Sequence, residues 1–273
     1  MKGTIEVILG GRLSVMTAAD MKQTIRYSRT YRYLMLNKIR TVLLFVFFVL
    51  PASAFWAFFS PEVTRKIAEI SERILSTGLG AGSFTIGTTD FSSGEISYLL
   101  TEGMLPDVLF SLGNFLLTLA VLFVLTFFLK VRPVSIFLYI ALLVQLCSCL
   151  FFIFFPELFP YSLSEYSDLY MKQQIGIFIC MTFVMGCVTS FLPIAAWKVI
   201  AAVVSCGLYS FVFSIVRYTT FLFLMKEFSV LYMACMFFTF GPLIDFLYLV
   251  AIYSLVADHT SGCLAKDMEV WQW

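Results

Sequence analysis

The chain has 273 residues and a formal net charge of +1, with 60% hydrophobic and 13% charged residues. A soluble domain carries about 25% charged residues. The composition therefore excludes an ordinary soluble protein and predicts an integral membrane protein. The small net charge hides an asymmetry, because eight Lys and Arg side chains lie in residues 1–40. We expect this basic segment to contact the membrane and not a nucleic acid.

Residues 1–40 are predicted to form a basic cytoplasmic leader that contains an interfacial amphipathic helix. A capping-box-like start at Thr17 and Asp20 precedes a stretch to Asn37 in which Lys and Arg alternate with Tyr. A helix on the membrane surface has this composition. A solvated leader that obeys the positive-inside rule has it too, so both interpretations stay open. No apolar segment opens the chain, and we expect no cleavable signal peptide.

Six apolar segments are predicted to cross the membrane as helices, since each can span most of a hydrocarbon core about 30 Å thick. They are residues 41–59, 108–129, 135–155, 175–192, 199–216 and a segment within 228–256. The predicted fold is all-α, a polytopic bundle over residues 41–257. Residues 258–273 are expected to form a short cytoplasmic tail.

The longest polar segment, residues 60–106, is predicted to lie outside. Its first part, Pro61 to Ser76, has the apolar spacing of an amphipathic helix. The glycine-rich part from Gly78 to Gly94 indicates a flexible or turn-rich loop, and Glu95 to Met104 is predicted to form a second short helix. A second polar loop is expected over Pro156 to Lys172.

The distribution of Lys and Arg predicts the orientation. With the N-terminus inside, 12 of the 17 cations outside the spans lie on the inner side, as the positive-inside rule requires. Six spans then place both termini in the cytoplasm. The expected location is a plasma membrane or a bacterial inner membrane.

Arg217 and Asp245 are the leading candidates for a functional site, because each lies within an apolar run where a charge is costly. In a simple helical hairpin they would differ in depth by about 13 Å. A direct ion pair therefore needs a bend, which Gly241-Pro242 could supply. The alternative for Arg217 is an interfacial anchor that reaches the surface. Two further embedded polar residues, Asn114 and Gln145, are expected to form hydrogen bonds between helices.

The last two apolar runs are longer than a membrane is thick. Residues 199–225 and 228–256 would measure about 40 and 43 Å as helices. Either both helices tilt strongly, or residues 218–237 contain a re-entrant segment. Six spans, an interfacial leader helix and such a break resemble the architecture of ABC-2-type transporter permeases. Because the chain has no nucleotide-binding motif, that resemblance implies a separate ATPase or other membrane subunits as partners.

A second resemblance is local and concerns the exosortase/archaeosortase family of membrane transpeptidases. The stretch Phe213 to Leu224, which holds Arg217, is similar to the Arg-bearing helix of that family. The resemblance implies a Cys nucleophile upstream, for which Cys187 and Cys180 are the candidates, and His259 as a third member. The small residues that follow the family's Cys are absent here.

The seven cysteines give no sign of a disulfide framework, since no pair lies in a predicted external loop. His259 and Cys263 have a ligand-like spacing, but two ligands do not make a metal site. We expect no metal and no cofactor. The sequence favours a non-enzymatic permease or an accessory membrane subunit of an export or envelope-assembly system, with the transpeptidase as the alternative.

Overall fold

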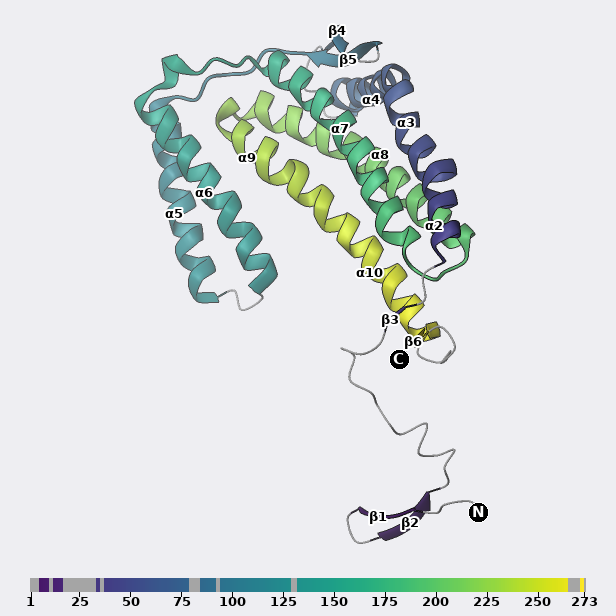
Figure 1. Cartoon of the computed structure of the whole chain (residues 1–273). Coiled ribbons are helices and arrows are strands. Elements are labelled where there is room, and N and C mark those ends of the chain that lie inside the picture. Colours follow the sequence, from purple (N-terminus) through teal and green to yellow (C-terminus); the bar gives the residue numbers. More distant parts are fainter. Residues whose placement is uncertain are drawn as a thin grey trace.

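The computed structural model describes residues 5–9, 12–16, 33–34, 37–78, 84–91, 94–128, 132–264 and 271–272. The helices, some with a short π or 3₁₀ segment, are α2 (Lys38–Leu44), η2 (Phe45–Val49), α3 (Leu50–Phe58), α4 (Ser60–Arg73), η3 (Ile74–Gly78), α5 (Val108–Phe128), α6 (Arg132–Phe154), η4 (Pro156–Leu158), α7 (Leu163–Ser190), α8 (Ala196–Glu227), η5 (Val230–Tyr232), α9 (Met233–Phe238), η6 (Thr239–Leu243) and α10 (Ile244–Leu264). The strands are β1 (Ile5–Leu9), β2 (Arg12–Met16), β3 (Tyr33–Leu34), β4 (Thr85–Phe91), β5 (Gly94–Leu100) and β6 (Trp271–Gln272). Figure 1 shows their arrangement.

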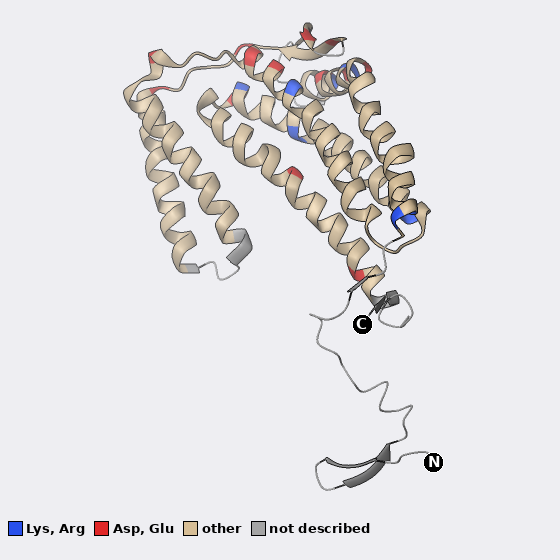
Figure 2. Cartoon of the chain, in the orientation of Figure 1, with Lys and Arg blue, Asp and Glu red and all other residues tan. Residues whose placement is uncertain are grey.

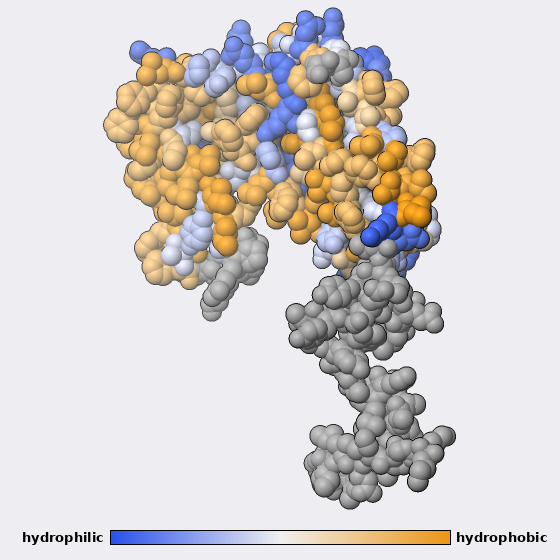
Figure 3. Space-filling view, in the orientation of Figure 1, coloured by the Kyte–Doolittle hydropathy of each residue, from blue (hydrophilic) through white to orange (hydrophobic). Residues whose placement is uncertain are grey.

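Six helices are long and apolar enough to cross a membrane, which confirms the all-α class and a multi-pass membrane protein. These spans are Lys38–Phe58, Val108–Phe127, Ser135–Phe154, Leu163–Ser190, Ala196–Glu227 and Val230–Ser261. Hydrophobic residues cover most of the sides of the helices in Figure 3. Such a surface suits contact with lipid, because an apolar patch of this extent is rare on a soluble monomer.

The spans form two groups in Figure 1. α5 and α6 make a hairpin at one side, and the other spans pack together as the main bundle. Ser148 of α6 donates a hydrogen bond of 2.7 Å to the Leu231 carbonyl, which joins the hairpin to the start of the sixth span. The β4–β5 pair and α4 lie across the end of the main bundle where the first span ends.

The fourth span begins at Leu163 and not at Ile175 as predicted, so most of the expected loop from Pro156 to Lys172 is helical. The Ser162 hydroxyl accepts from the Glu165 backbone N–H at 3.2 Å, and the Glu165 carboxylate accepts from the Ser162 N–H at 2.7 Å. This reciprocal cap starts a helix even in a polar stretch. α7 therefore extends past the apolar run and carries polar side chains into the bundle.

The fifth span is one continuous helix through Glu227, which excludes a re-entrant segment at residues 218–227. Its 32 residues give a length of about 48 Å, so α8 runs obliquely across the bundle (Figure 1). The sixth span is broken at Gly241, where the backbone has the non-helical angles φ −82° and ψ −110°, and Pro242 follows. The predicted bend at this dipeptide is confirmed.

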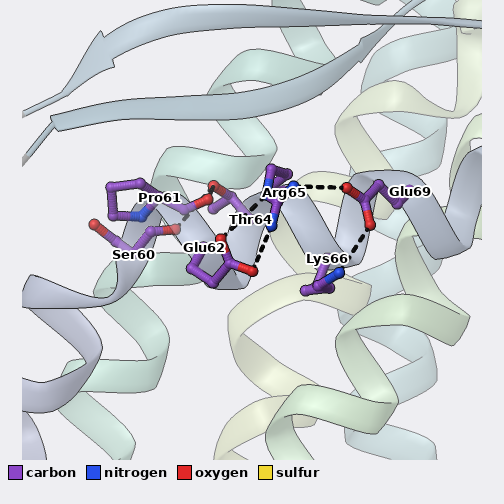
Figure 4. Close-up of polar contacts among 7 residues, drawn as sticks. All are labelled: Ser60, Pro61, Glu62, Thr64, Arg65, Lys66 and Glu69. Carbon is purple, nitrogen blue, oxygen red and sulfur yellow. Dashed lines mark hydrogen bonds and ion pairs between the residues drawn. The ribbon is translucent and has the colours of Figure 1, made fainter.

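The predicted amphipathic helix after the first span is confirmed as α4. Its outward face carries Glu62, Arg65, Lys66 and Glu69 in a chain of ion pairs of 2.6 to 3.3 Å (Figure 4). The hydrogen bond from Arg65 holds the pKa of Glu62 below its ordinary value. These pairs are half exposed, and such pairs stabilise a helix little.

Two predictions for the external segment are wrong. The stretch expected to be a turn-rich loop contains β4, and the second short helix expected at Glu95 to Met104 is instead β5 with an extended continuation. The strands pair antiparallel from Thr85 opposite Leu100 to Phe91 opposite Gly94. Gly94 has φ +144°, a conformation that other residues rarely adopt.

The interior has two apolar clusters. The larger one lies under α4 and the β4–β5 hairpin and includes Ile67, Leu75, Ile96, Leu99, Tyr170, Phe178, Tyr218 and Leu222. The smaller one lies further along the spans and consists of Met185, Ala202, Val203, Cys206, Tyr248 and Leu249. The ion pair of the candidate site joins α8 and α10, which contribute to these clusters.

The predicted interfacial leader helix falls mostly on residues 17–32, outside the described part of the chain. The division into leader, membrane domain and tail stays a prediction. α10 continues to Leu264, beyond the predicted start of the tail at Asp258. The six cysteines with described side chains, Cys147, Cys149, Cys180, Cys187, Cys206 and Cys235, are free thiols.

Candidate functional site

Arg217 and Asp245 form a direct ion pair inside the bundle. The Arg217 Nη1 lies 2.7 Å from the Asp245 Oδ2, and the two residues are 3% and 1% exposed. Asp245 lies near the middle of its span, in a region where Figure 2 shows few charges between the two charged ends of the molecule. The interfacial-anchor alternative for Arg217 is wrong, because its guanidinium turns inward and is buried.

The break in the sixth span brings the two charges to the same depth. At the break, the carbonyls of Phe240 and Gly241 accept hydrogen bonds from the Arg217 Nη1 at 3.2 and 3.0 Å. The non-helical angles of Gly241 interrupt the regular helical hydrogen-bond ladder at this point. In a membrane, carbonyls at such a break need other donors, and Arg217 donates to two of them. The guanidinium thus binds both the carboxylate and the broken backbone.

Two residues of α7 complete the coordination of Arg217. The Tyr170 hydroxyl accepts from Nε at 2.6 Å, and the Gln174 side-chain oxygen accepts from Nη2. The guanidinium also lies over the rings of Tyr170 and Phe213, 5.5 and 5.6 Å from their centroids. Arg217 therefore joins three spans, α7, α8 and the sixth.

Sequence analysis missed Tyr170 and Gln174, because it placed Tyr170 in a polar loop and Gln174 between that loop and the fourth span. The signal that could have found them is the capping box at Ser162 and Glu165, followed by Tyr166, Tyr170 and Gln174 at intervals of four residues. Residues four apart lie on one face of a helix. That face points to Arg217.

A chain of contacts connects this pair to the β4–β5 hairpin. Tyr170 stacks on Tyr218, with ring centroids 5.3 Å apart. The Tyr218 hydroxyl accepts from the backbone N–H of Leu99 in β5 at 2.9 Å and shares a hydrogen bond with Ser167. The β4–β5 hairpin and the embedded charges are thus linked by direct contacts.

Three buried polar atoms next to Arg217 or its partners have no hydrogen-bond partner in the described structure. They are the Asp245 Oδ1, the Gln174 Nε2 and the Tyr166 hydroxyl. An unsatisfied buried polar group costs about 1–3 kcal/mol. Arg217 is well satisfied, while these atoms leave both acceptor and donor capacity for a proton, a water or a small polar ligand.

Asn114 and Gln145 differ from each other. The Asn114 Oδ1 accepts from the Tyr232 hydroxyl at 2.6 Å, which links α5 to the start of the sixth span as expected. Gln145 contacts Cys149 of its own helix, with the Nε2 3.8 Å from the sulfur. Neither residue contacts Arg217 among the described hydrogen bonds. Asn114 therefore links two spans as predicted, whereas the described contact of Gln145 lies within its own helix.

The residues of a Cys-based site do not meet at Arg217. Cys180 and Cys187 lie about 9 and 20 Å further along α7 than Gln174, by helix rise. Both are at least partly exposed on the side of the bundle. His259 follows Asp245 by about 21 Å along α10. No observation favours the transpeptidase over a non-enzymatic role.

Among the residues with described side chains, no group of three or more His, Cys, Asp or Glu is placed to hold a metal ion. No family model, curated protein or solved structure matches the chain.

Proposed function

We propose that this protein is a non-enzymatic, transporter-like permease of the cell envelope, or the membrane subunit of an export or envelope-assembly system. The observation that carries the proposal is the coincidence of a buried ion pair with a broken helix near mid-span. Secondary transporters bind substrate and coupling ions near the membrane midplane, where discontinuous helices expose polar backbone. Ionisable residues at that depth usually serve a pathway or a relay.

In this proposal, protonation of Asp245 or ligand binding to it changes the arrangement of the sixth span. The Oδ2 of Asp245 is paired with Arg217, and its Oδ1 accepts no hydrogen bond of ordinary geometry, while the Tyr248 hydroxyl lies near the carboxylate. Protonation of the carboxylate, or a polar ligand that competes for it, weakens the pair. Arg217 then loses one of its contacts to the sixth span, and the segment beyond Gly241 can change its angle to α8. The free energy of that change is supplied by the differential binding of the proton or ligand to the two arrangements.

The proposed environment follows from charge. The inner side carries the leader, Lys130, Arg132, Lys198 and Lys266, as the positive-inside rule expects of a plasma or bacterial inner membrane. A role in active export would need a separate ATPase as a partner, since the chain carries no nucleotide-binding motif.

Thiol accessibility on both sides of the membrane tests the proposal. Gln173 of α7 lies next to the break, with its amide 3.6 to 3.8 Å from the position of a Cβ on Gly241. In a cysteine-free variant, Gln173→Cys should react with an impermeant thiol reagent in both right-side-out and inverted vesicles. Alternating access exposes a midplane site to each side in turn. Asp245→Asn should shift the ratio of the two labelling rates, because it weakens the contact between residue 245 and Arg217.

The matched control is Val216→Cys, one residue before Arg217 but 55% exposed on the side of the bundle. It should stay unreactive, since a thiol in hydrocarbon does not ionise. A Gln173→Cys thiol that reacts from neither side, or an Asp245→Asn variant with unchanged rates, would show that the ion pair is purely structural and would contradict the proposal.

A further inference from the structure

A groove runs along the first span from its charged end into the bilayer. The part at the charged end has a volume of about 590 Å³ and lies between α2 and the start of α8. It is lined by Arg40, Leu43, Leu44, Phe47, Phe48 and Ala196, among others. A second cavity of about 470 Å³ continues along α3 and α8. The two share the lining residues Phe47 and Phe48, so they lie next to each other along the first span, and together they are here called the α2–α8 groove.

The groove has a built floor. Gly186 of α7 lets the first span approach closely, because a Cβ there would lie 2.5 Å from a methyl of Val49. Gly207 of α8 does the same for Trp56, with 3.1 Å to the indole ring. The Trp56 Nε1 donates to the Thr182 hydroxyl at 2.9 Å, which fixes the indole at the far end. Trp56, Thr182 and Gly207, which line the second cavity, are therefore held in place by close packing and a hydrogen bond.

The charged end of the groove is formed by Arg40. Arg40 is half-buried, and its Nη2 is buried without a hydrogen-bond partner. In the part of the chain that the structure describes, no carboxylate pairs with it. Lys38 and Lys198 lie two residues from the lining residues Arg40 and Ala196. Figure 2 shows Lys and Arg gathered at the start of α2, and Figure 3 shows orange residues beside them.

The length of the groove matches one leaflet. From Arg40 to Ala52 the helix rises about 18 Å, and one leaflet with its headgroup region is about 20–22 Å thick. We propose that the α2–α8 groove binds an anionic glycerophospholipid of the adjoining leaflet, with the phosphate at Arg40 and an acyl chain along Phe47 and Phe48. Arg prefers phosphate because its guanidinium can donate two parallel hydrogen bonds.

A photoactivatable lipid tests this assignment on the full-length protein in vesicles. The probe is phosphatidylglycerol with a diazirine midway along one acyl chain, and phosphatidylcholine with the same chain is the neutral probe. Mass spectrometry measures the crosslink yield in residues 41–56 relative to the yield at Leu116 and Leu117. These two exposed residues of α5 report ordinary lipid contact. The ratio should be about five-fold higher for phosphatidylglycerol, the effect of about 1 kcal/mol that one cation has near an anionic surface.

Three variants complete the test. Arg40→Gln should abolish the preference, Arg40→Lys should retain part of it, and Lys38→Gln, which removes an exposed charge outside the groove, should retain most of it. Equal ratios for the two probes, or an unchanged preference in Arg40→Gln, would overturn the proposal. A groove that crosslinks only after residues 1–36 are deleted would also overturn it, because the chain itself would then be the occupant.

Discussion

At the scale of single residues, Arg217 and Asp245 are both buried because each is paired with the other. Arg217 contacts a carboxylate, a phenol, an amide and two carbonyls, so its burial is compensated by contacts from two other spans. The sequence singled out the two charges and the Gly-Pro dipeptide as a place for a bend, because they stand out in apolar runs, but it left open whether Arg217 and Asp245 pair. It did not predict Tyr170 and Gln174, because a polar residue in a polar stretch carries no signal of burial.

Removing one member of the pair should destabilise the protein more than removing both. Arg217→Ala leaves a buried carboxylate without a partner, and the expected loss is about 3–5 kcal/mol. Arg217→Ala combined with Asp245→Ala should recover part of this loss. The midpoint of thermal unfolding in detergent measures the effect, with membrane abundance as a second readout.

The control for this prediction is Arg65→Ala on α4, which breaks an exposed pair with Glu62. It should leave the midpoint nearly unchanged, since exposed ion pairs contribute little. If Arg217→Ala unfolds at the same temperature as the parent protein, the pair does not support the bundle.

At the scale of elements, the clearest lesson concerns the external hairpin. A short helix was predicted at Glu95 to Met104, and the structure has the strand β5 there instead. Ile96 and Leu99 are buried because β5 packs between α4 and α7, whereas Leu100 is exposed, and no local sequence pattern records this packing. By contrast, α4 was predictable because its polar and apolar faces follow its own helical period.

Side chains from three helices satisfy the free edge of β5. Thr64 of α4 accepts from the Ser97 N–H at 3.2 Å, Tyr218 of α8 from the Leu99 N–H at 2.9 Å, and Ser164 of α7 from the Thr101 N–H at 3.0 Å. A strand edge without such partners pairs with other chains. The hairpin is therefore fixed to the bundle through its backbone.

Removing the Tyr218 hydroxyl should loosen the hairpin. Tyr218→Phe leaves the buried Leu99 N–H without an acceptor, at an expected cost of about 1–3 kcal/mol. Faster proteolysis between residues 84 and 100, together with a lower thermal midpoint, would show it. Tyr209→Phe on the same helix, where the ring is 46% exposed, should change neither. Equal proteolysis of the two variants would mean that Thr64 and Ser164 hold the strand without Tyr218.

At the scale of the whole molecule, hydropathy predicted the six spans but not their tilt or length. An apolar run indicates the part of a helix that lies in hydrocarbon. α7 and α8 continue past their apolar runs because of N-terminal capping and of packing against other helices. The orientation in the membrane depends on charge. α4 and the hairpin lie at one end of the bundle, and the start of α2 and the end of α10 lie at the other (Figure 1).

Single-cysteine labelling measures this orientation. In a cysteine-free variant on intact cells, Glu95→Cys in the hairpin should react with an impermeant reagent, and Asp258→Cys in α10 should react only after the membrane is opened. Both positions are exposed, so a difference between them reports sidedness and not burial. Labelling of Asp258→Cys on intact cells would reverse the proposed topology.

The contacts of the first span also constrain the order of events during synthesis. Thr182, which receives the hydrogen bond of Trp56, is 126 residues further along the chain, and Ser190, which binds Thr41, is 149 residues further. At about 5–20 residues per second, the first helix waits roughly 6–25 s for the partner of Trp56. During that interval it must persist in the bilayer, or beside the insertion machinery, with its lateral face unmatched. Early quality control of this chain therefore acts on a first span that still lacks its partners on α7.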